Sequence, residues 1–301
     1  MQDVGTLGGP DALPGFSFQP GVVVGASFTD DIPNPTTGIP TLHPFLWKKG
    51  HMQDLGTLGG TLCCQETVVA NSRGQVATDS TLAGDLVTHP VLWDKGKLID
   101  LGTLGGTNGV VNGINDRGEV VGFAARPGDP GNDGFLWRNG VMTDLGNLGR
   151  TSSAWVVNSQ GQVIGASRID GTPGNIRAFL WEKGGPIVDL NALIPENSPL
   201  TLVYAANINE RGEIAGLGVP AGCAPPDVGT CGHAYFLIPD GICDGDCQSR
   251  VDQSQAEAEL RRATAPIQAE RSESPVRSPE QFRNQMRQWF GLSGAHPTLR
   301  D

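Results

Sequence analysis

A seven-residue motif recurs along most of this chain and constrains its fold more than any other feature. It reads Asp-Val-Gly-Thr-Leu-Gly-Gly at Asp3–Gly9 and returns, with Leu in place of Val, at Asp54–Gly60 and Asp100–Gly106. Weaker copies follow at Asp144–Arg150 and Asp189–Pro195, so that successive aspartates lie 44 to 51 residues apart. Such a period predicts a repeat architecture, in which each unit buries its apolar faces against its neighbours.

Two further elements recur in register inside each interval. The first is an Asn-x-x-Gly turn that leads into an apolar stretch, and the second resembles Phe-Leu-Trp. The turns begin at Asn71, Asn115, Asn158 and Asn209, and the second element occurs at Phe45–Trp47, Val91–Trp93, Phe135–Trp137, Phe179–Trp181 and Tyr235–Leu237. The first interval has Pro20–Gly25 in place of the Asn-x-x-Gly turn. Five copies of one unit therefore account for the chain up to about Gly241.

Each unit is predicted to contain four short strands. In the third interval these are Lys97–Leu101, Val110–Ile114, Glu119–Ala124 and Gly134–Arg138, with glycine in the tight turns where the backbone needs a positive φ. The chain has 43 Gly and 22 Pro among 301 residues, which excludes a helical bundle. Four antiparallel strands per unit of about 45 residues predict an all-β fold, a five-bladed β-propeller over residues 1–241.

The count of strands predicts that the ring closes. The chain opens with the first strand of a unit, and the fifth unit ends at Tyr235–Ile238 without that strand after it. We therefore predict that Met1–Gly5 pairs antiparallel with Ala234–Ile238, which removes two exposed sheet edges and leaves a monomer. A fragment of a longer array and an open solenoid are the alternatives.

The repeat elements resemble those of a bacterial group, the extracellular repeat family named for its His-Ala-Phe (HAF) tripeptide. The resemblance rests on the Asp-Leu-Gly-Thr-Leu-Gly-Gly copies, on Ile114–Gly122 and on His43-Pro-Phe-Leu-Trp47, and the tripeptide itself stands as His233-Ala-Tyr235. It covers roughly residues 1–240 and implies a protein of the cell envelope or the outside of the cell. It implies no substrate or reaction. Met1 directly precedes a repeat motif, with no apolar signal segment before it.

The net charge and the hydropathy of the chain argue against nucleic-acid binding and against a transmembrane segment. The formal net charge of −11 argues against nucleic acid, because phosphate binding needs a basic face. No run of apolar residues is long enough to predict a transmembrane segment.

Three histidines occupy one position of the repeat. His43, His89 and His233 stand there, and the other two units carry Asp133 and Arg177. If this position faced a central channel, the histidines and Asp133 would be candidate metal ligands. Arg177 would oppose a cation in that ring, so we favour a structural role, with each histidine hydrogen-bonded to a loop carbonyl. We likewise expect the motif aspartates to accept backbone N–H bonds in their turns. No cofactor is predicted.

Four cysteines crowd the end of the last unit, and in an exported family they indicate two disulfides. The predicted pairs are Cys223 with Cys231 and Cys243 with Cys247, and a four-thiolate zinc site is the alternative. Cys63 and Cys64 are adjacent in the second unit. We expect them not to bond to each other, because neighbouring Cβ atoms diverge in an extended strand. They are interpreted as buried small residues or as partners of another group.

The remaining residues, 242–301, differ in composition and are predicted to be a partly disordered tail. It would hold the cysteine-containing exit, a linker at Arg271–Pro279 and a short amphipathic helix that begins at Ser278. Four large apolar residues would share one face of that helix and bind a partner: Phe282, Met286, Trp289 and Phe290.

Two classes of function fit this pattern. The first is a non-catalytic exported protein that binds or scaffolds a surface carbohydrate or protein. The second is a hydrolase or lyase with its active site in an axial cavity. An enzyme needs unlike polar residues gathered at one end of the ring. The inserts that depart most from the repeat, Ala12–Gln19, Asp30–Pro40 and Val219–Gly232, contain no acid/base pair of that kind. We therefore favour the binding protein.

Overall fold

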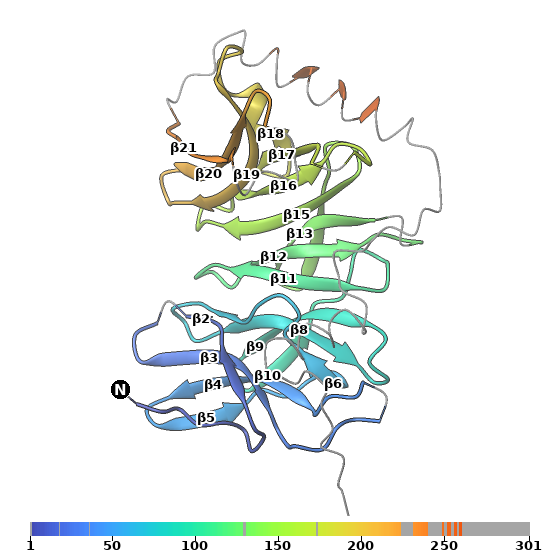
Figure 1. Ribbon diagram of the computed structural model, residues 1–301, viewed down its shortest axis with the longest axis vertical. Coiled ribbons are helices and arrows are strands. Elements are labelled where there is room, and N and C mark those ends of the chain that lie inside the picture. The colour runs from blue at the N-terminus through green and yellow to red at the C-terminus, as the bar shows by residue number, and fades with distance from the viewer. Residues whose placement is uncertain are drawn as a thin grey trace, which may run out of the picture.

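The computed structural model describes residues 2–17, 19–35, 37–128, 131–172, 174–223 and 231–239, with a few more between 249 and 260. Between residues 2 and 239 the named elements are twenty-one strands and one short 3-10 helix, η1 (Leu190–Ala192), and the described residues between 249 and 260 are helical. The strands make five sheets that follow one another in chain order along the long axis of the molecule (Figure 1). The all-β class predicted from the sequence is confirmed. Within the described ranges, no helix has the length and apolar character needed to cross a membrane.

Each sheet is built mainly from antiparallel strands that are consecutive in the sequence. The first contains β1 (Ala12–Pro14), β3 (Val22–Phe28), β4 (Leu42–Lys48) and β5 (His51–Asp54). The second contains β2 (Phe16–Ser17), β6 (Gly59–Cys63), β7 (Val69–Ala70), β8 (Val76–Leu82), β9 (Thr88–Asp94) and β10 (Lys97–Asp100). The third contains β11 (Gly109–Ile114), β12 (Val120–Ala125), β13 (Asn132–Arg138) and β14 (Val141–Gly146). The fourth contains β15 (Thr151–Val157), β16 (Val163–Arg168), β17 (Ile176–Trp181) and β18 (Val188–Asp189), and the fifth contains β19 (Leu200–Ile208), β20 (Ile214–Pro220) and β21 (His233–Leu237).

A glycine that faces an aromatic ring recurs in four of the sheets. Gly122 lies opposite Phe135, and a Cβ added to Gly122 would stand 2.0 Å from the carbonyl oxygen of Val110 and 2.9 Å from Cε1 of that ring. The same arrangement pairs Gly25 with Phe45, Gly165 with Phe179, and Gly216 with Tyr235. The glycine and the aromatic residue of the repeat are therefore two halves of one contact.

Apolar side chains fill the spaces between neighbouring sheets. The cluster between the first two sheets includes Val24, Phe28, Leu62 and Cys63, all at most 2% exposed. Three further clusters lie between the second and third, third and fourth, and fourth and fifth sheets. No sheet buries both faces by itself, so stacking of the units produces the core, as the repeat pattern predicts.

A ladder of asparagine side chains ties the second unit to the third, the third to the fourth and the fourth to the fifth. Nδ2 of Asn71 donates to the carbonyl oxygen of Asn115 at 2.9 Å. Asn115 donates in the same way to Asn158, and Asn158 to Asn209, each at 3.0 Å. The Asn-x-x-Gly turn thus contributes a hydrogen bond between sheets as well as a hairpin.

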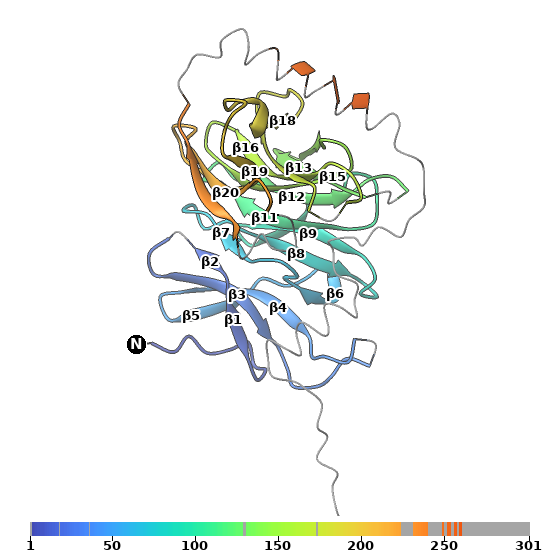
Figure 2. The same ribbon diagram turned by 45° about the horizontal axis from the view of Figure 1, so that its top comes forward.

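The predicted closure of the ring is wrong for this structure. Residues 2–6 belong to no strand, and among the described residues β21 pairs with β20 alone, so the part of the fifth sheet that the structure describes has three strands. In the other units the strand before the motif has two to six residues, as in β5, and it ends at or just beyond the motif aspartate. Gln2 and Asp3 are the described residues at the equivalent place, and Asp3 makes the same turn with Gly5 but has no strand beside it among the described residues. The first and last sheets lie at opposite ends of the row in Figure 1. Figure 2, which brings the top forward, keeps the first sheet at the lower end and shows the fifth sheet in projection over the middle ones.

Candidate functional site

Two of the three repeat-position histidines form a clip with a motif aspartate, in each case inside a single sheet. Nδ1 of His43 lies 2.9 Å from both carboxylate oxygens of Asp54, and Nδ1 of His89 lies 2.9 and 3.0 Å from those of Asp100. Because a carboxylate only accepts, Nδ1 carries the hydrogen in each pair. Our prediction that these histidines bond to a loop carbonyl is wrong, because each bonds to the carboxylate at the end of the next strand.

The third and fourth units keep this clip with other residue types. Asp133 is 2% exposed, and its carboxylate accepts a hydrogen bond of 2.8 Å from Nδ2 of Asn147, which replaces the threonine of the first copies. The guanidinium of Arg126 lies 3.7 Å from the same carboxylate. In the fourth unit Nε of Arg177 lies 4.0 Å from Asp189. Each of the first four units therefore has its own complementary pair.

The structure does not bring the candidate metal ligands together. His43, His89, Asp133 and His233 lie on β4, β9, β13 and β21, which belong to four different sheets. Among the described residues there is no group of three or more His, Cys, Asp or Glu side chains placed to hold a metal ion. The geometry thus favours the structural interpretation of this repeat position.

The motif aspartates also organise the turns that follow them. Asp54 accepts a hydrogen bond from the N–H of Gly56 at 2.8 Å, and the N–H of Leu58 donates to the hydroxyl of Ser80 at 2.9 Å. Burial raises the pKa of Asp54, but the hydrogen bonds from His43 and Gly56 outweigh it and hold the pKa below its ordinary value. This confirms the prediction that these aspartates accept backbone N–H bonds.

Cys63 and Cys64 form a disulfide with each other, so our expectation that they could not is wrong. The expectation assumed an extended strand through both residues. β6 ends at Cys63, and Cys64 adopts a φ of 67°, which brings the two side chains together. Both residues are buried, at 0% and 6% exposure, as the sequence indicated.

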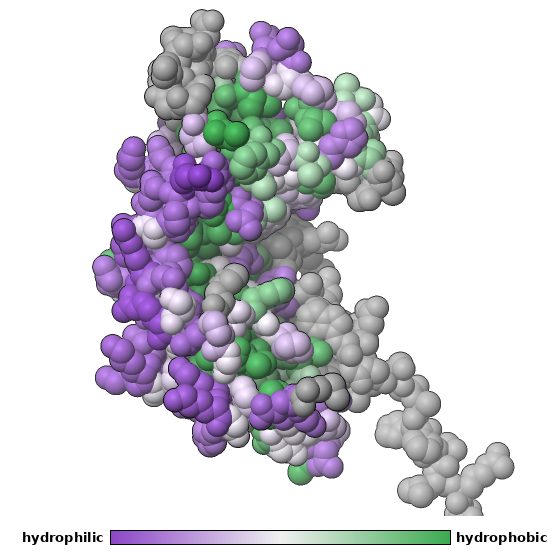
Figure 3. All heavy atoms as spheres, turned by 90° about the vertical axis from the view of Figure 1, so that its left-hand side faces the viewer, coloured by the Kyte–Doolittle hydropathy of each residue, from purple (hydrophilic) through white to green (hydrophobic). Residues whose placement is uncertain are grey.

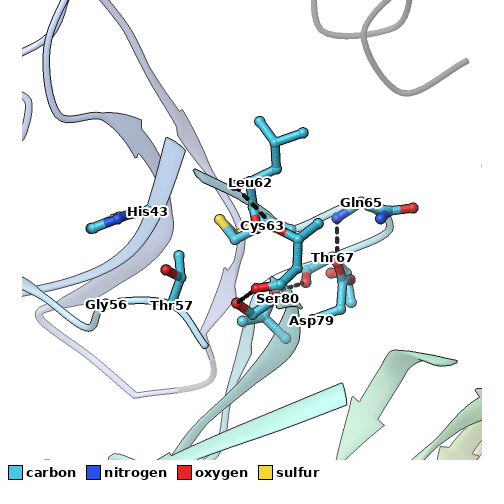
Figure 4. The surroundings of a disulfide bond; sticks show 12 residues. His43, Gly56, Thr57, Leu62, Cys63, Gln65, Thr67, Asp79 and Ser80 are labelled. Atoms are coloured by element: carbon cyan, nitrogen blue, oxygen red, sulfur yellow. Dashed lines mark hydrogen bonds between the residues drawn. A yellow bond between two sulfur atoms is a disulfide. The ribbon is translucent and has the colours of Figure 1, made fainter. Parts of the chain in front are cut away.

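The disulfide begins a tightly held loop between β6 and β7. The N–H groups of Cys64 and Gln65 donate to the carbonyl and the carboxylate of Asp79 at 3.0 and 2.9 Å, and Asp79 is fully buried. The Thr78 hydroxyl donates to the carbonyl of Thr67 at 2.7 Å. In Figure 4, Gln65, Thr67 and Asp79 lie close together on the second sheet, and His43 lies on the neighbouring first sheet. The loop is therefore fixed to the sheet at several points.

A pocket of about 350 Å³ lies between this loop and the insert Ala12–Gln19. The insert crosses from the first sheet to the second, where β2 pairs in parallel with β7. A Cβ on Gly15 would stand 2.2 Å from the carbonyl oxygen of Val68, so only glycine allows this crossing. The pocket is lined by Leu13, Pro14, Gly15, Phe16, Gly25, Ala26, Leu42, Cys64, Glu66, Thr67 and Val68.

The lining of the pocket has an apolar floor and a mixed rim. Ala26, Leu42 and Cys64 are at most 6% exposed and supply the buried part. Phe16 is 68% exposed, and Glu66 is also exposed. An apolar concavity with a few polar groups at its edge is the usual form of a ligand site. This pocket can hold an apolar group and place a cation or a hydrogen-bond donor beside Glu66.

The sequence did not predict this pocket, although it carried one signal for it. The insert Ala12–Gln19 was among the segments that depart most from the repeat, and it supplies four of the lining residues. The other side of the pocket depends on the turn at Cys64, which the repeat pattern does not predict.

The remaining predicted sites fall at or beyond the end of the described residues. Cys223 and Cys231 form a disulfide. Cys243 and Cys247 lie outside the described residues, so their pairing stays a prediction. The same holds for the linker and for the apolar helix face of the tail, Phe282, Met286, Trp289 and Phe290.

Comparisons with known proteins give no family. No family model matches the chain, and no curated protein matches it. Three similar solved structures are TolB from Acinetobacter baumannii (13% identity, TM-score 0.42), an acylaminoacyl peptidase from Pyrococcus horikoshii (12%, 0.42) and a xylan β-1,4-xylosidase from Bacillus halodurans (13%, 0.30). The matches cover 70%, 73% and 76% of this chain but only 52%, 35% and 55% of the other proteins. Similarity at this level carries no argument about fold or activity.

Proposed function

We propose that this protein is a non-catalytic binding protein built from propeller-type blades, and that its ligand is a protein. The observation that carries the proposal is the pocket beside the Cys63–Cys64 disulfide, with its apolar floor and its rim of Phe16 and Glu66. We propose that it receives an apolar side chain of the ligand, next to which a basic residue meets Glu66.

The chemistry of the floor favours a protein ligand over a carbohydrate. The hydroxyl groups of a buried sugar ring would need hydrogen-bond partners, and the side chains of Ala26, Leu42 and Cys64 supply carbon and sulfur. The chain carries a net charge of −11, which attracts a basic partner during encounter. Burying one leucine-sized side chain contributes about 1.5–3 kcal/mol. A single anchor of this kind gives weak binding, which a longer ligand would strengthen by further contacts.

We include in this proposal that the chain is an array of five units, that it belongs to the HAF family and that it is exported. Each of the first four sheets has a Phe-Leu-Trp-type strand between two antiparallel neighbours, and successive sheets bury an apolar cluster between them, as propeller blades do. Two disulfides support a protein that matures in an oxidising compartment. The alternative, a hydrolase or lyase with an axial site, requires a closed ring, whereas the described sheets form an open row.

Short peptides test the proposed pocket directly. The probes are acetyl-Lys-Leu-Lys-amide, acetyl-Glu-Leu-Glu-amide and glucose, titrated into ¹⁵N-labelled protein. We expect the basic peptide to shift the amide signals of Gly15, Thr67 and Val68 with a dissociation constant of about 5–80 mM. The acidic peptide should bind more weakly. Phe16→Ser and Glu66→Gln should each weaken binding of the basic peptide.

The matched control is Leu86→Ser, because Leu86 is 77% exposed and does not line the pocket. This variant should bind like the parent protein. Equal binding by Phe16→Ser and Leu86→Ser would contradict the proposed site. Shifts at the pocket with glucose but not with the basic peptide would favour a carbohydrate ligand instead.

A further inference from the structure

The outer edge of the fifth sheet is built to receive another strand. In the first four sheets the Phe-Leu-Trp-type strands β4, β9, β13 and β17 have a partner on each side. In the described residues β21 pairs only with β20, so one row of its backbone N–H and C=O groups has no strand beside it. An exposed edge of this kind pairs readily with an extended segment.

The face of the fifth sheet beyond this edge is also exposed. Phe236 occupies the position of Leu92 and Leu136, which are 2% and 3% exposed. Leu136 is buried in the cluster between its own sheet and the next one, whereas Phe236 is 58% exposed and Ile238 is 67% exposed. Figure 3 shows apolar residues gathered on the upper part of this side of the molecule, at the end that carries the last sheet. The fifth sheet therefore has the surface that a following sheet would cover.

Two halves of the repeated clip are left over at opposite ends of the row. His233 is exposed on β21, and no motif aspartate lies beside it among the described residues. Asp3 is exposed at the other end, where its carboxylate accepts the N–H of Gly5 at 2.9 Å and no histidine accompanies it in the described part of the chain. The two residues are complementary in the way that His43 and Asp54 are.

The complete units predict how these halves would join. Asp54 lies opposite Phe45, Gln53 lies opposite Leu46, and the N–H of Leu55 donates to the carbonyl of Pro44 at 3.0 Å. The same register places Asp3 opposite Tyr235 and Gln2 opposite Phe236. It also directs the N–H of Val4 to the carbonyl of Ala234.

The segment that carries Asp3 is held on the first sheet. The N–H of Leu7 donates to the hydroxyl of Ser27 at 2.9 Å, and the N–H of Gly9 donates to the carbonyl of Phe28 at 3.0 Å. The first and fifth sheets lie at opposite ends of the row in Figure 1, the view that has the long axis vertical. Residues 2–5 therefore cannot reach β21 of their own chain without rearrangement of the whole row, but they are placed to meet β21 of another molecule.

We propose that residues 2–5 of a second copy of this chain add to the outer edge of β21, with Asp3 of that copy bound to His233 and its first sheet covering Phe236. The contact is head to tail, so the copies form either a closed ring or a growing chain. This association is independent of the proposed ligand pocket.

Complementation between two variants tests the proposal. Sedimentation equilibrium of the full chain should show association that rises with concentration. Asp3→Ala and His233→Ala should each weaken it about 1.5-fold to fivefold, the range expected for an exposed ion pair. A mixture of the two variants should associate more strongly than either alone, because Asp3 of one copy then meets His233 of the other. His89→Ala, which removes a clip inside the second sheet, is the matched control and should leave association unchanged.

Cross-linking distinguishes a second copy from closure of the ring within one chain. Gln2→Cys protein mixed with Phe236→Cys protein should form a disulfide between chains on oxidation. The control mixture pairs Gln2→Cys with Phe16→Cys, since Phe16 is at least as exposed as Phe236 and lies on another surface. A chain that stays monomeric, or cross-linking no greater than in the control mixture, would overturn the proposal. So would a double variant, Gln2→Cys with Phe236→Cys, that cross-links only within itself.

Discussion

One added methyl group tests the contact between a glycine and an aromatic ring that recurs through the sheets. Gly122 of β12 lies between β11 and the ring of Phe135 on β13. The Cβ of Gly122→Ala would stand 2.0 Å from the carbonyl oxygen of Val110. Because that oxygen belongs to the backbone, β11 itself has to move away from β12.

The cost of Gly122→Ala follows from this displacement. Ordinary contact for a Cβ begins at 3.4 Å, so the strands must separate by roughly 1.4 Å, more than an N–H···O bond tolerates. Loss of two adjacent ladder bonds costs about 2 kcal/mol, and crowding against the ring adds about 1 kcal/mol. We expect the free energy of unfolding to fall by about 3 kcal/mol, a large part of the stability of an ordinary domain.

Urea unfolding followed by far-ultraviolet circular dichroism measures this loss. The control is Gly185→Ala, where the nearest atom is the carbonyl oxygen of Glu182 at 3.5 Å and the change should stay within about 0.5 kcal/mol. Adding Phe135→Val to Gly122→Ala should lower stability further, because the contact with Val110 remains and the fully buried ring of Phe135 is lost. Equal stability of the Gly122→Ala and Gly185→Ala proteins would refute the argument.

In the second sheet a residue with a side chain occupies the position of this glycine. Thr78 stands where the other units have glycine, opposite Val91 rather than an aromatic residue. The chain that pairs with β8 leaves the sheet there, between β6 and β7, and the Thr78 hydroxyl donates to the carbonyl of Thr67. A side chain is tolerated at this position because the neighbouring backbone has moved away.

Three other predictions concern the ladder, the disulfide and pH. Asn115→Asp should lower the free energy of unfolding by about 3 kcal/mol, because it sets a carboxylate against the carbonyl of Asn158 and the buried Glu119. Asn209→Asp, at the end of the ladder, should lower it by less in the same urea assay. Under non-reducing conditions, mass mapping should find the peptide that contains Cys63 and Cys64 lighter by two hydrogens than its reduced form, and two free thiols there would contradict the assignment. The lowered pKa of Asp54 means that its clip stabilises the fold above the ordinary pKa of 3.8 and loses this effect as the pH falls through the folded value. The stability difference between the parent and Asp54→Asn should therefore shrink below pH 4, and a difference that grows there would contradict it.

Much of the local structure follows from neighbouring residues in the sequence. The recurrence of Asp-Leu-Gly-Thr-Leu-Gly-Gly, Asn-x-x-Gly and Phe-Leu-Trp located the units and most of their strands, because turn glycines and short apolar stretches act over a few residues. The bonds from Asp54 to its own turn are of the same local kind. The partners of the histidines were missed, since His43 and Asp54 meet across two strands eleven residues apart.

The features that separate one unit from another were decided by the tertiary structure. Closure of the ring depends on the small rotation between successive sheets, summed over five units, and that rotation is set by side-chain packing between sheets rather than by the repeat. The disulfide between Cys63 and Cys64 depends on a left-handed turn at Cys64, held by the buried Asp79. The pocket exists because the insert Ala12–Gln19 crosses to the second sheet beside that turn. Each of these features joins segments whose proximity no local pattern encodes, because it arises only when the sheets pack.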